Sequence, residues 1–194
     1  MNYYEFWTRL DEISLGEMFK KMMEDPTLAA CKKRHNAIDM VKITKLAWTP
    51  YKGMNTLLVR ALAQSKQKDG SVHEYTPLVE FKKVQYVKDA TYAPKYLPNI
   101  AVISAVMQQG GSPEPVAFYK LQRDKTDVLV RCQCEDYKWT FSSHNKAAGA
   151  LFGGAYKKPK PQGLKPSPNP NKIEGMCKHI LKLFKVLEKT GIFA

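Results

Sequence analysis

Two short stretches decide how this chain is organised: Val128-Leu129-Val130-Arg131-Cys132-Gln133-Cys134, and Cys177-Lys178-His179. The first has the pattern of a strand, and residues two apart on a strand face the same side, so the two sulfurs point together. The second opens a predicted helix over 173–189 and adds one sulfur and one imidazole. Three thiols and one imidazole form a ligand set for tetrahedral Zn²⁺. The sequence therefore predicts a zinc site at Cys132, Cys134, Cys177 and His179.

We expect this zinc ion to be structural. Four protein ligands leave no open position for the water that a catalytic zinc ion needs. Because 42 residues separate Cys134 from Cys177, the ion would clip the edge of a sheet to the last helix. The alternative is three buried free thiols and an incidental histidine, since unpaired cysteine is often buried. The chain has four cysteines, and residues 1–5 lack the basic start of a signal peptide, so we expect no export and no disulfide scaffold.

The hydrophobic periodicity predicts an α+β fold with an antiparallel sheet. Strand-like runs cover 55–62, 75–87, 116–121 and 128–134, and the apolar run 100–107 fits a strand or a helix. Turns are predicted at 68–71 and 110–113, and short helices over 27–35 and 142–152. We expect an α+β body over 1–125, followed by a zinc-binding segment over 126–194 that contains a Pro/Lys-rich loop at 155–172.

An amphipathic helix is predicted over 2–25, where apolar residues recur mostly at steps of three and four. Asn2 and Glu5 supply a capping signal, and Asp25-Pro26 ends the helix. Its apolar stripe, which includes Phe6, Trp7 and Leu10, is either core or a face for a partner. Cys31 and His35, which follow this helix, are four residues apart, but two ligands alone do not make a zinc site.

The chain is strongly basic, with 31 Lys and Arg against 18 Asp and Glu, a net charge of +13. Residues 142–194 hold ten lysines against two glutamates, so an acidic partner would be met there. Contact with nucleic acid or a neighbouring subunit is predicted for the loop lysines Lys157, Lys158, Lys160 and Lys165, with a solvated surface as the alternative. The aromatic content disfavours disorder, and the absence of a run of about 18 apolar residues predicts no membrane span.

The pattern Cys-x-Cys followed by Cys-x-His resembles the SWIM zinc finger, a module linked with DNA or protein binding. A longer stretch is similar to virion-associated proteins of large tailed bacteriophages. It runs from Cys132-Gln-Cys-Glu-Asp-Tyr137 through Lys146-Ala-Ala-Gly-Ala150 and Asn169-Pro-Asn171 to Gly175-Met-Cys-Lys-His179. The resemblance covers about residues 126–194. It implies a non-enzymatic structural component of the neck, tail or baseplate, assembled in the host cytoplasm with other virion proteins as a homo- or hetero-oligomer.

Two other functions stay open alongside this one. The first is a nucleic-acid-binding SWIM-type module, whose lysines would contact phosphates and whose binding would weaken with salt. The second is a genome-processing nuclease that uses the carboxylates of Glu135 and Asp136. We expect these two residues to serve the turn instead, and Tyr137 and Trp139 to pack beside the zinc site rather than stack on bases. No phosphate-binding loop or deaminase pattern is present, so we expect no enzyme activity.

Overall fold

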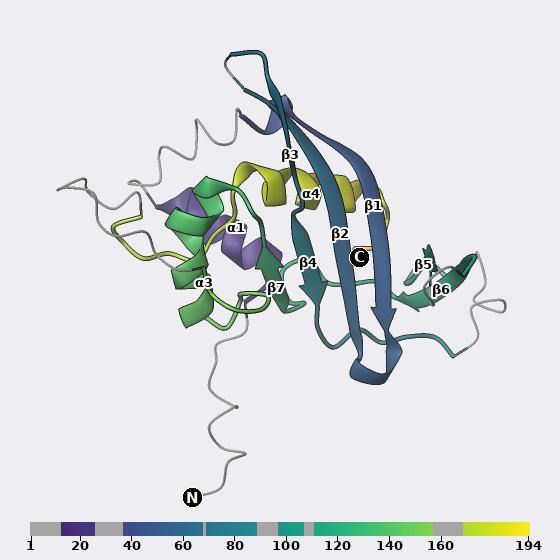
Figure 1. Ribbon diagram of the computed structural model, residues 1–194. Coiled ribbons are helices and arrows are strands. Elements are labelled where there is room, and N and C mark those ends of the chain that lie inside the picture. The colour runs from purple at the N-terminus through teal and green to yellow at the C-terminus, as the bar shows by residue number, and fades with distance from the viewer. Residues whose placement is uncertain (1–12, 26–36, 68, 89–96, 107–110, 157–168) are drawn as a thin grey trace, which may run out of the picture.

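The computed structural model describes residues 13–25, 37–67, 69–88, 97–106, 111–156 and 169–194, and it has the predicted α+β architecture (Figure 1). The first half contains α1 (Leu15–Glu24), the 3₁₀ turns η2 (Ala37–Met40) and η3 (Lys52–Met54), and the strands β1 (Val41–Tyr51), β2 (Thr56–Lys66), β3 (Val72–Tyr75) and β4 (Leu78–Phe81). The second half contains β5 (Ile100–Val106), β6 (Pro113–Tyr119), β7 (Val128–Arg131), the π-helical turn η4 (Tyr137–Phe141), α3 (Ser142–Ala147) and α4 (Lys178–Lys189).

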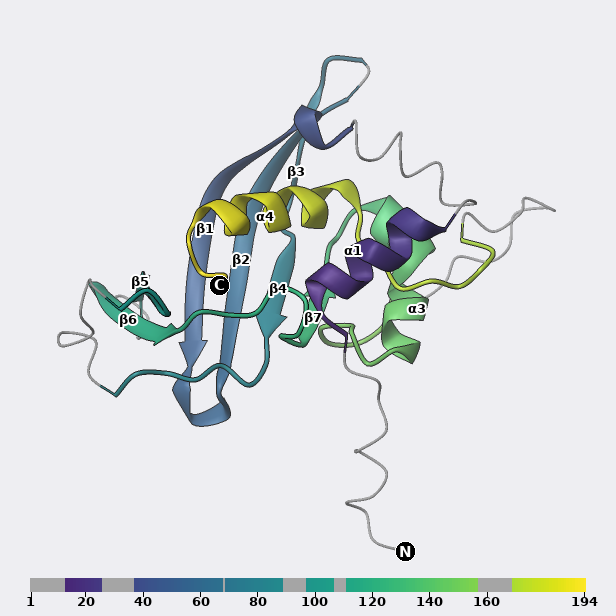
Figure 2. The same ribbon diagram turned by 180° about the vertical axis from the view of Figure 1, so that it is seen from behind.

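Five strands form an antiparallel sheet in the order β1-β2-β4-β7, and β3 pairs with the far end of β2. Both the proposed body, 1–125, and the proposed segment, 126–194, contribute strands to this sheet, and their separation as domains stays a prediction. The apolar run at 100–107 is a strand, because β5 pairs with β6 in a separate two-stranded sheet. This hairpin lies at the end of the molecule opposite α1 and α3 (Figures 1 and 2).

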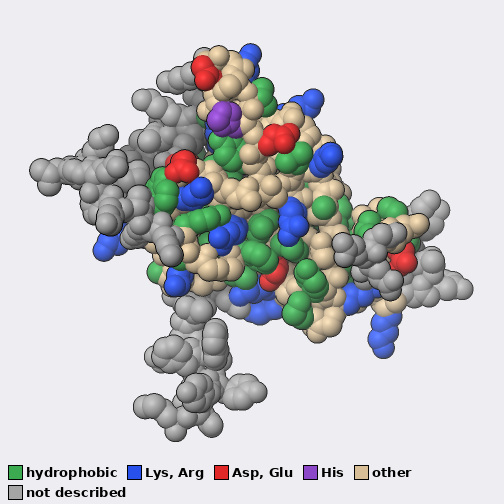
Figure 3. All heavy atoms as spheres, in the orientation of Figure 1, with side chains coloured by type: hydrophobic (Ala, Val, Ile, Leu, Met, Phe, Trp, Pro, Cys, Tyr) green, Lys and Arg blue, Asp and Glu red, His purple; other side chains and the backbone are tan. Residues whose placement is uncertain are grey.

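The helix α4 lies across one face of the large sheet (Figure 2). Alternate residues of β2 from Leu57 to Ser65 are buried, as a strand with one covered face requires. The buried side of α4 meets this layer with Ile180, Leu183, Phe184 and Leu187. The opposite face of the sheet carries no helix among the described residues, and Figure 3 shows hydrophobic side chains mixed with Lys and Arg on that side.

One predicted strand has different bounds in the structure, and one observed strand was not predicted. The bounds of the predicted strand over 75–87 are wrong: Tyr75 ends β3, β4 ends at Phe81, and Pro77, which has no N–H for a ladder, lies between them. The predicted turn at 68–71 is confirmed: the Gln67 N–H donates to the Ser71 carbonyl at 2.8 Å, and Gly70 adopts φ +87°. The strand β1 was not predicted, since a bulge between Ile43 and Lys45 interrupts its alternation.

The N-terminal helix is confirmed, but its predicted start is wrong within the described residues. Ser14 is extended (φ −85°, ψ 164°) and pairs with Asp127, so a continuous helix over 2–25 is broken there. The Ser14 side chain accepts a hydrogen bond from the Glu17 N–H at 3.0 Å and so caps α1. Residues 2–12, including Phe6, Trp7 and Leu10, and the predicted helix at 27–35 lie outside the described residues.

Candidate metal centre

The first two cysteines follow β7, which carries them to the edge of the large sheet. Val130 and the rest of β7 pair with β4, while the Val130 N–H also donates to the Ala150 carbonyl at 2.9 Å. The strand ends at Arg131, so the predicted end of this strand at 134 is wrong. Cys132 and Cys134 lie just beyond β7 and not within it. A helical segment begins immediately afterwards at Glu135 and continues through η4 into α3. Cys134 is therefore held between a strand end and a helix start.

The second pair of ligands lies at the start of α4. Cys177 is the N-cap residue of this helix and His179 is in its first turn. The prediction that the helix starts at 173 is wrong, because side chains satisfy the backbone before it. Asn169 Oδ1 accepts from the Ile173 N–H at 3.1 Å, and Asn145 Oδ1 accepts from the Gly175 N–H at 2.9 Å. The helix can begin only after these contacts, at Lys178.

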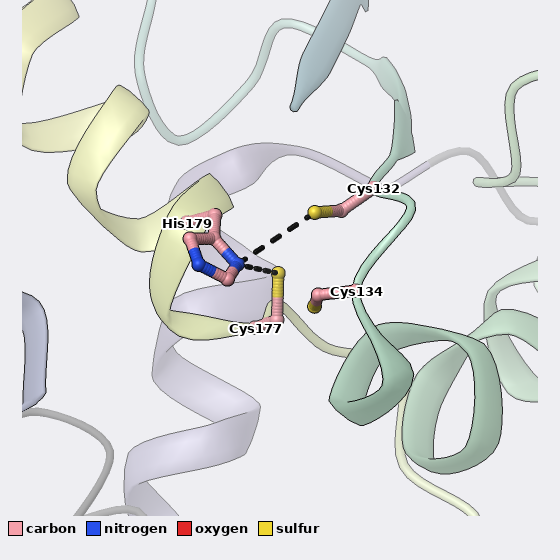
Figure 4. Close-up of side chains that lie close together, drawn as sticks. All are labelled: Cys132, Cys134, Cys177 and His179. Atoms are coloured by element: carbon pink, nitrogen blue, oxygen red, sulfur yellow. Dashed lines mark hydrogen bonds between the residues drawn. The ribbon is translucent and has the colours of Figure 1, made fainter. Parts of the chain in front are cut away.

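The fold brings all four predicted ligands together (Figure 4). The three sulfurs and one imidazole nitrogen lie within 4.8 Å of one another. The His179 Nδ1 atom is 3.8 Å from the Cys132 Sγ and 3.9 Å from the Cys177 Sγ. All four side chains are buried, with at most 4% of any residue exposed. Such a cluster of soft sulfur and nitrogen donors can hold a single metal ion.

The thiols of this centre differ in their readiness to ionise. Hydrogen bonds from Cys132 and then Cys177 lower the pKa of Cys134, and its sulfur also faces the Tyr137 N–H at 3.4 Å. The hydrogen bond that Cys132 makes to Cys134 raises the pKa of Cys132, and burial raises the pKa of Cys177. A bound cation would favour deprotonation of these two thiols.

The ring of His179 is oriented by an aromatic neighbour. Tyr75 on β3 packs against it, with ring centroids 4.2 Å apart. Since Nδ1 faces the sulfurs, Nδ1 is the atom available to a metal ion. The Nε2 atom is buried and has no hydrogen-bond partner among the described residues. Sequence analysis missed Tyr75, because nothing local connects residue 75 with residue 179.

The other predicted site residues do not join the metal centre or lie outside the described residues. Lys157, Lys158, Lys160 and Lys165, and also Cys31 and His35, lie outside the described residues. Glu135 accepts hydrogen bonds from Lys138 at 3.1 Å and from the Trp139 indole N–H, and Asp136 accepts from Thr140 at 3.2 Å. Both carboxylates thus serve the helical turn that they begin. Tyr137 is buried, as expected for packing beside the centre, whereas Trp139 is 39% exposed.

No protein-family model, curated protein or solved structure matches the chain. No helix in the described part of the chain combines the length and the apolar character needed to cross a membrane.

Proposed function

We propose that the protein binds one structural Zn²⁺ ion through Cys132, Cys134, Cys177 and His179. The observation that carries this proposal is the approach of all four ligand atoms to within 4.8 Å of one another in a buried centre. With Zn–S near 2.3 Å and Zn–N near 2.05 Å, a tetrahedral site has S···N edges of about 3.6 Å and S···S edges of about 3.8 Å. The measured S···N distances of 3.8 and 3.9 Å lie close to this value.

The ion has a structural rather than a catalytic role in this proposal. Four protein ligands complete a tetrahedron, so no position is open for water or substrate. Burial of all four ligands also keeps bulk solvent from the ion. Zinc would join the end of β7 to the start of α4, and so hold the C-terminal helix to the sheet.

The metal content of the purified protein tests this role. We expect one zinc per chain by elemental mass spectrometry, and loss of that zinc in Cys132→Ala and in His179→Ala. The matched control is Cys31→Ala, which removes a cysteine outside the ligand set and should retain the metal. A different metal at one per chain would contradict the choice of zinc, and a metal-free folded protein in which the thiols of Cys132, Cys134 and Cys177 are free would contradict the site itself.

We propose further that this is a non-enzymatic structural protein of a tailed-phage particle, at its neck, tail or baseplate. Its support is the resemblance of residues 126–194 to phage virion-associated proteins, together with a proposed metal centre whose role is structural rather than catalytic. The partners would be other virion proteins, with packaged DNA as an additional contact for the basic loop. Proteomics of purified particles tests the proposal, since a structural component must be recovered from them in constant ratio to the other virion proteins. Its absence from intact particles would overturn it.

A further inference from the structure

Asn145 is a fully buried polar residue close to the metal centre, and its side chain uses all of its hydrogen-bonding atoms on two partners. Its amide nitrogen donates to the Gly175 carbonyl at 3.0 Å and its amide oxygen accepts from the Gly175 N–H at 2.9 Å. The second amide hydrogen is donated to the Tyr137 hydroxyl at 3.1 Å. The side chain therefore pairs with Gly175 as a neighbouring strand would, two residues before Cys177.

Tyr137 extends this contact to the other pair of ligands. Its ring is completely buried, and its hydroxyl donates to the Val130 carbonyl at 2.7 Å. Val130 precedes Cys132 by two residues, just as Gly175 precedes Cys177. The Tyr137 backbone N–H also faces the Cys134 sulfur at 3.4 Å. One chain of buried hydrogen bonds thus runs from Val130 through Tyr137 and Asn145 to Gly175, and none of these bonds requires a metal ion.

Close packing leaves Gly175 little room to move away from Asn145. A Cβ atom at this position would lie 2.5 Å from the Phe141 ring and 2.9 Å from the Met22 sulfur. The next residue, Met176, donates its N–H to that same sulfur at 3.0 Å. The backbone that leads into Cys177 is therefore held from two sides, by Asn145 and by α1.

We propose that Asn145 is a positioning residue for the metal centre. Through Tyr137 and Gly175, it holds the Cys132–Cys134 pair and the Cys177–His179 pair at binding distance before the metal arrives. The proposal rests on the metal binding proposed above and deepens it. Its consequence is a preorganised site, in which metal capture does not have to supply the free energy of bringing two distant segments together.

Asn145→Ala tests this role, with Asn169→Ala as the matched control. Asn169 is also a buried asparagine: its amide nitrogen donates to the Thr140 and Ile173 carbonyls, and its amide oxygen accepts from the Ile173 N–H. Both variants remove a comparable buried network, so their melting temperatures should fall by similar amounts. Competition with a chromophoric zinc chelator should show a loss of zinc affinity of about 10- to 100-fold for Asn145→Ala. Asn169→Ala should stay within a few-fold of wild type.

Tyr137→Phe is the second variant, and it keeps the buried ring while removing the hydroxyl that joins the two halves. It should also weaken zinc binding, and the ligand-field spectrum of its Co²⁺ form should differ from that of wild type. Equal losses of zinc affinity in Asn145→Ala and Asn169→Ala, or unchanged affinity in both Asn145→Ala and Tyr137→Phe, would overturn the positioning role. Failure of the wild-type protein to bind zinc would instead overturn the proposed metal site, so the two failures are distinguishable.

Discussion

In the proposed site, one zinc ion would hold together two ligand pairs that 42 residues separate, from Cys134 to Cys177, and the unfolded chain has no such preformed site. An ion that binds the folded chain and not the unfolded chain stabilises the folded state by about 4 kcal/mol when free zinc is about 1,000 times its Kd. In a protein of 194 residues, each kcal/mol corresponds to roughly 2–4 °C in Tm. We therefore expect the apo protein to unfold about 8–16 °C below the metal-loaded protein.

Differential scanning calorimetry of metal-loaded and chelator-stripped protein, in one reducing buffer, measures this difference. Cys177→Ser should reproduce the apo Tm, whereas Cys31→Ser should keep the metal and the wild-type Tm. Hydrogen exchange should locate the loss in α3 and α4 and leave the β5–β6 hairpin protected. A Tm difference below about 2 °C, in protein shown to hold one metal per chain, would refute stabilisation of the folded state by the bound metal.

Three further predictions address other parts of the molecule. Gly175→Ala places a methyl group against Phe141 and Met22, and chemical denaturation should show a loss of about 1–3 kcal/mol; an unchanged midpoint would contradict the close packing there. Burial raises the pKa of Glu80 against the opposing charge of Lys82. The folded state therefore binds this proton more tightly than the unfolded chain, and stability falls as pH rises through the folded pKa. Glu80→Gln should raise Tm at pH 7 and lose that gain below about pH 4, and a constant gain would contradict the burial effect. If the basic loop contacts DNA, fluorescence anisotropy should show affinity falling steeply with salt and reduced by Lys157→Glu with Lys160→Glu; salt-independent binding, or none at low salt, would count against that contact.

The ligands of the metal centre could be predicted because their chemistry is local. Cys132 and Cys134 share a side of the chain at the end of an apolar run, and Cys177 and His179 lie together at a helix start. Each pair is visible in three consecutive residues. The sequence did not show the exact bounds of these elements: β7 ends before Cys132, and α4 begins after Cys177 with His179 in its first turn.

The helical elements beside the centre were harder to predict, although two signals for them exist. Tyr137 and Trp139 alternate as on a strand, but the buried residues are Tyr137 and Phe141, four apart, which is the helical spacing. Similarly, Ser14-Leu15-Gly16-Glu17 has the spacing of a capping box and marks the start of α1. The predicted helix over 142–152 ends early, at Ala147, because Gly149 adopts a left-handed conformation (φ +65°). Leu151 then pairs with Val130 and returns the chain to the sheet.

The distance between the two ligand pairs could not be predicted, because long-range contacts determine it. An asparagine within a helix usually indicates exposure or a local backbone bond. Asn145 is instead buried against Gly175, 30 residues away. Its side chain can form these hydrogen bonds only when the chain between the two residues has folded back. Leaving a buried amide without partners would cost about 1–3 kcal/mol, so this asparagine favours the one arrangement in which Gly175 meets it. The same contact that satisfies the amide also places Cys177 opposite Cys132. The hydrogen bonds that the buried Asn145 side chain needs are therefore the ones that bring the two ligand pairs of the proposed metal centre together.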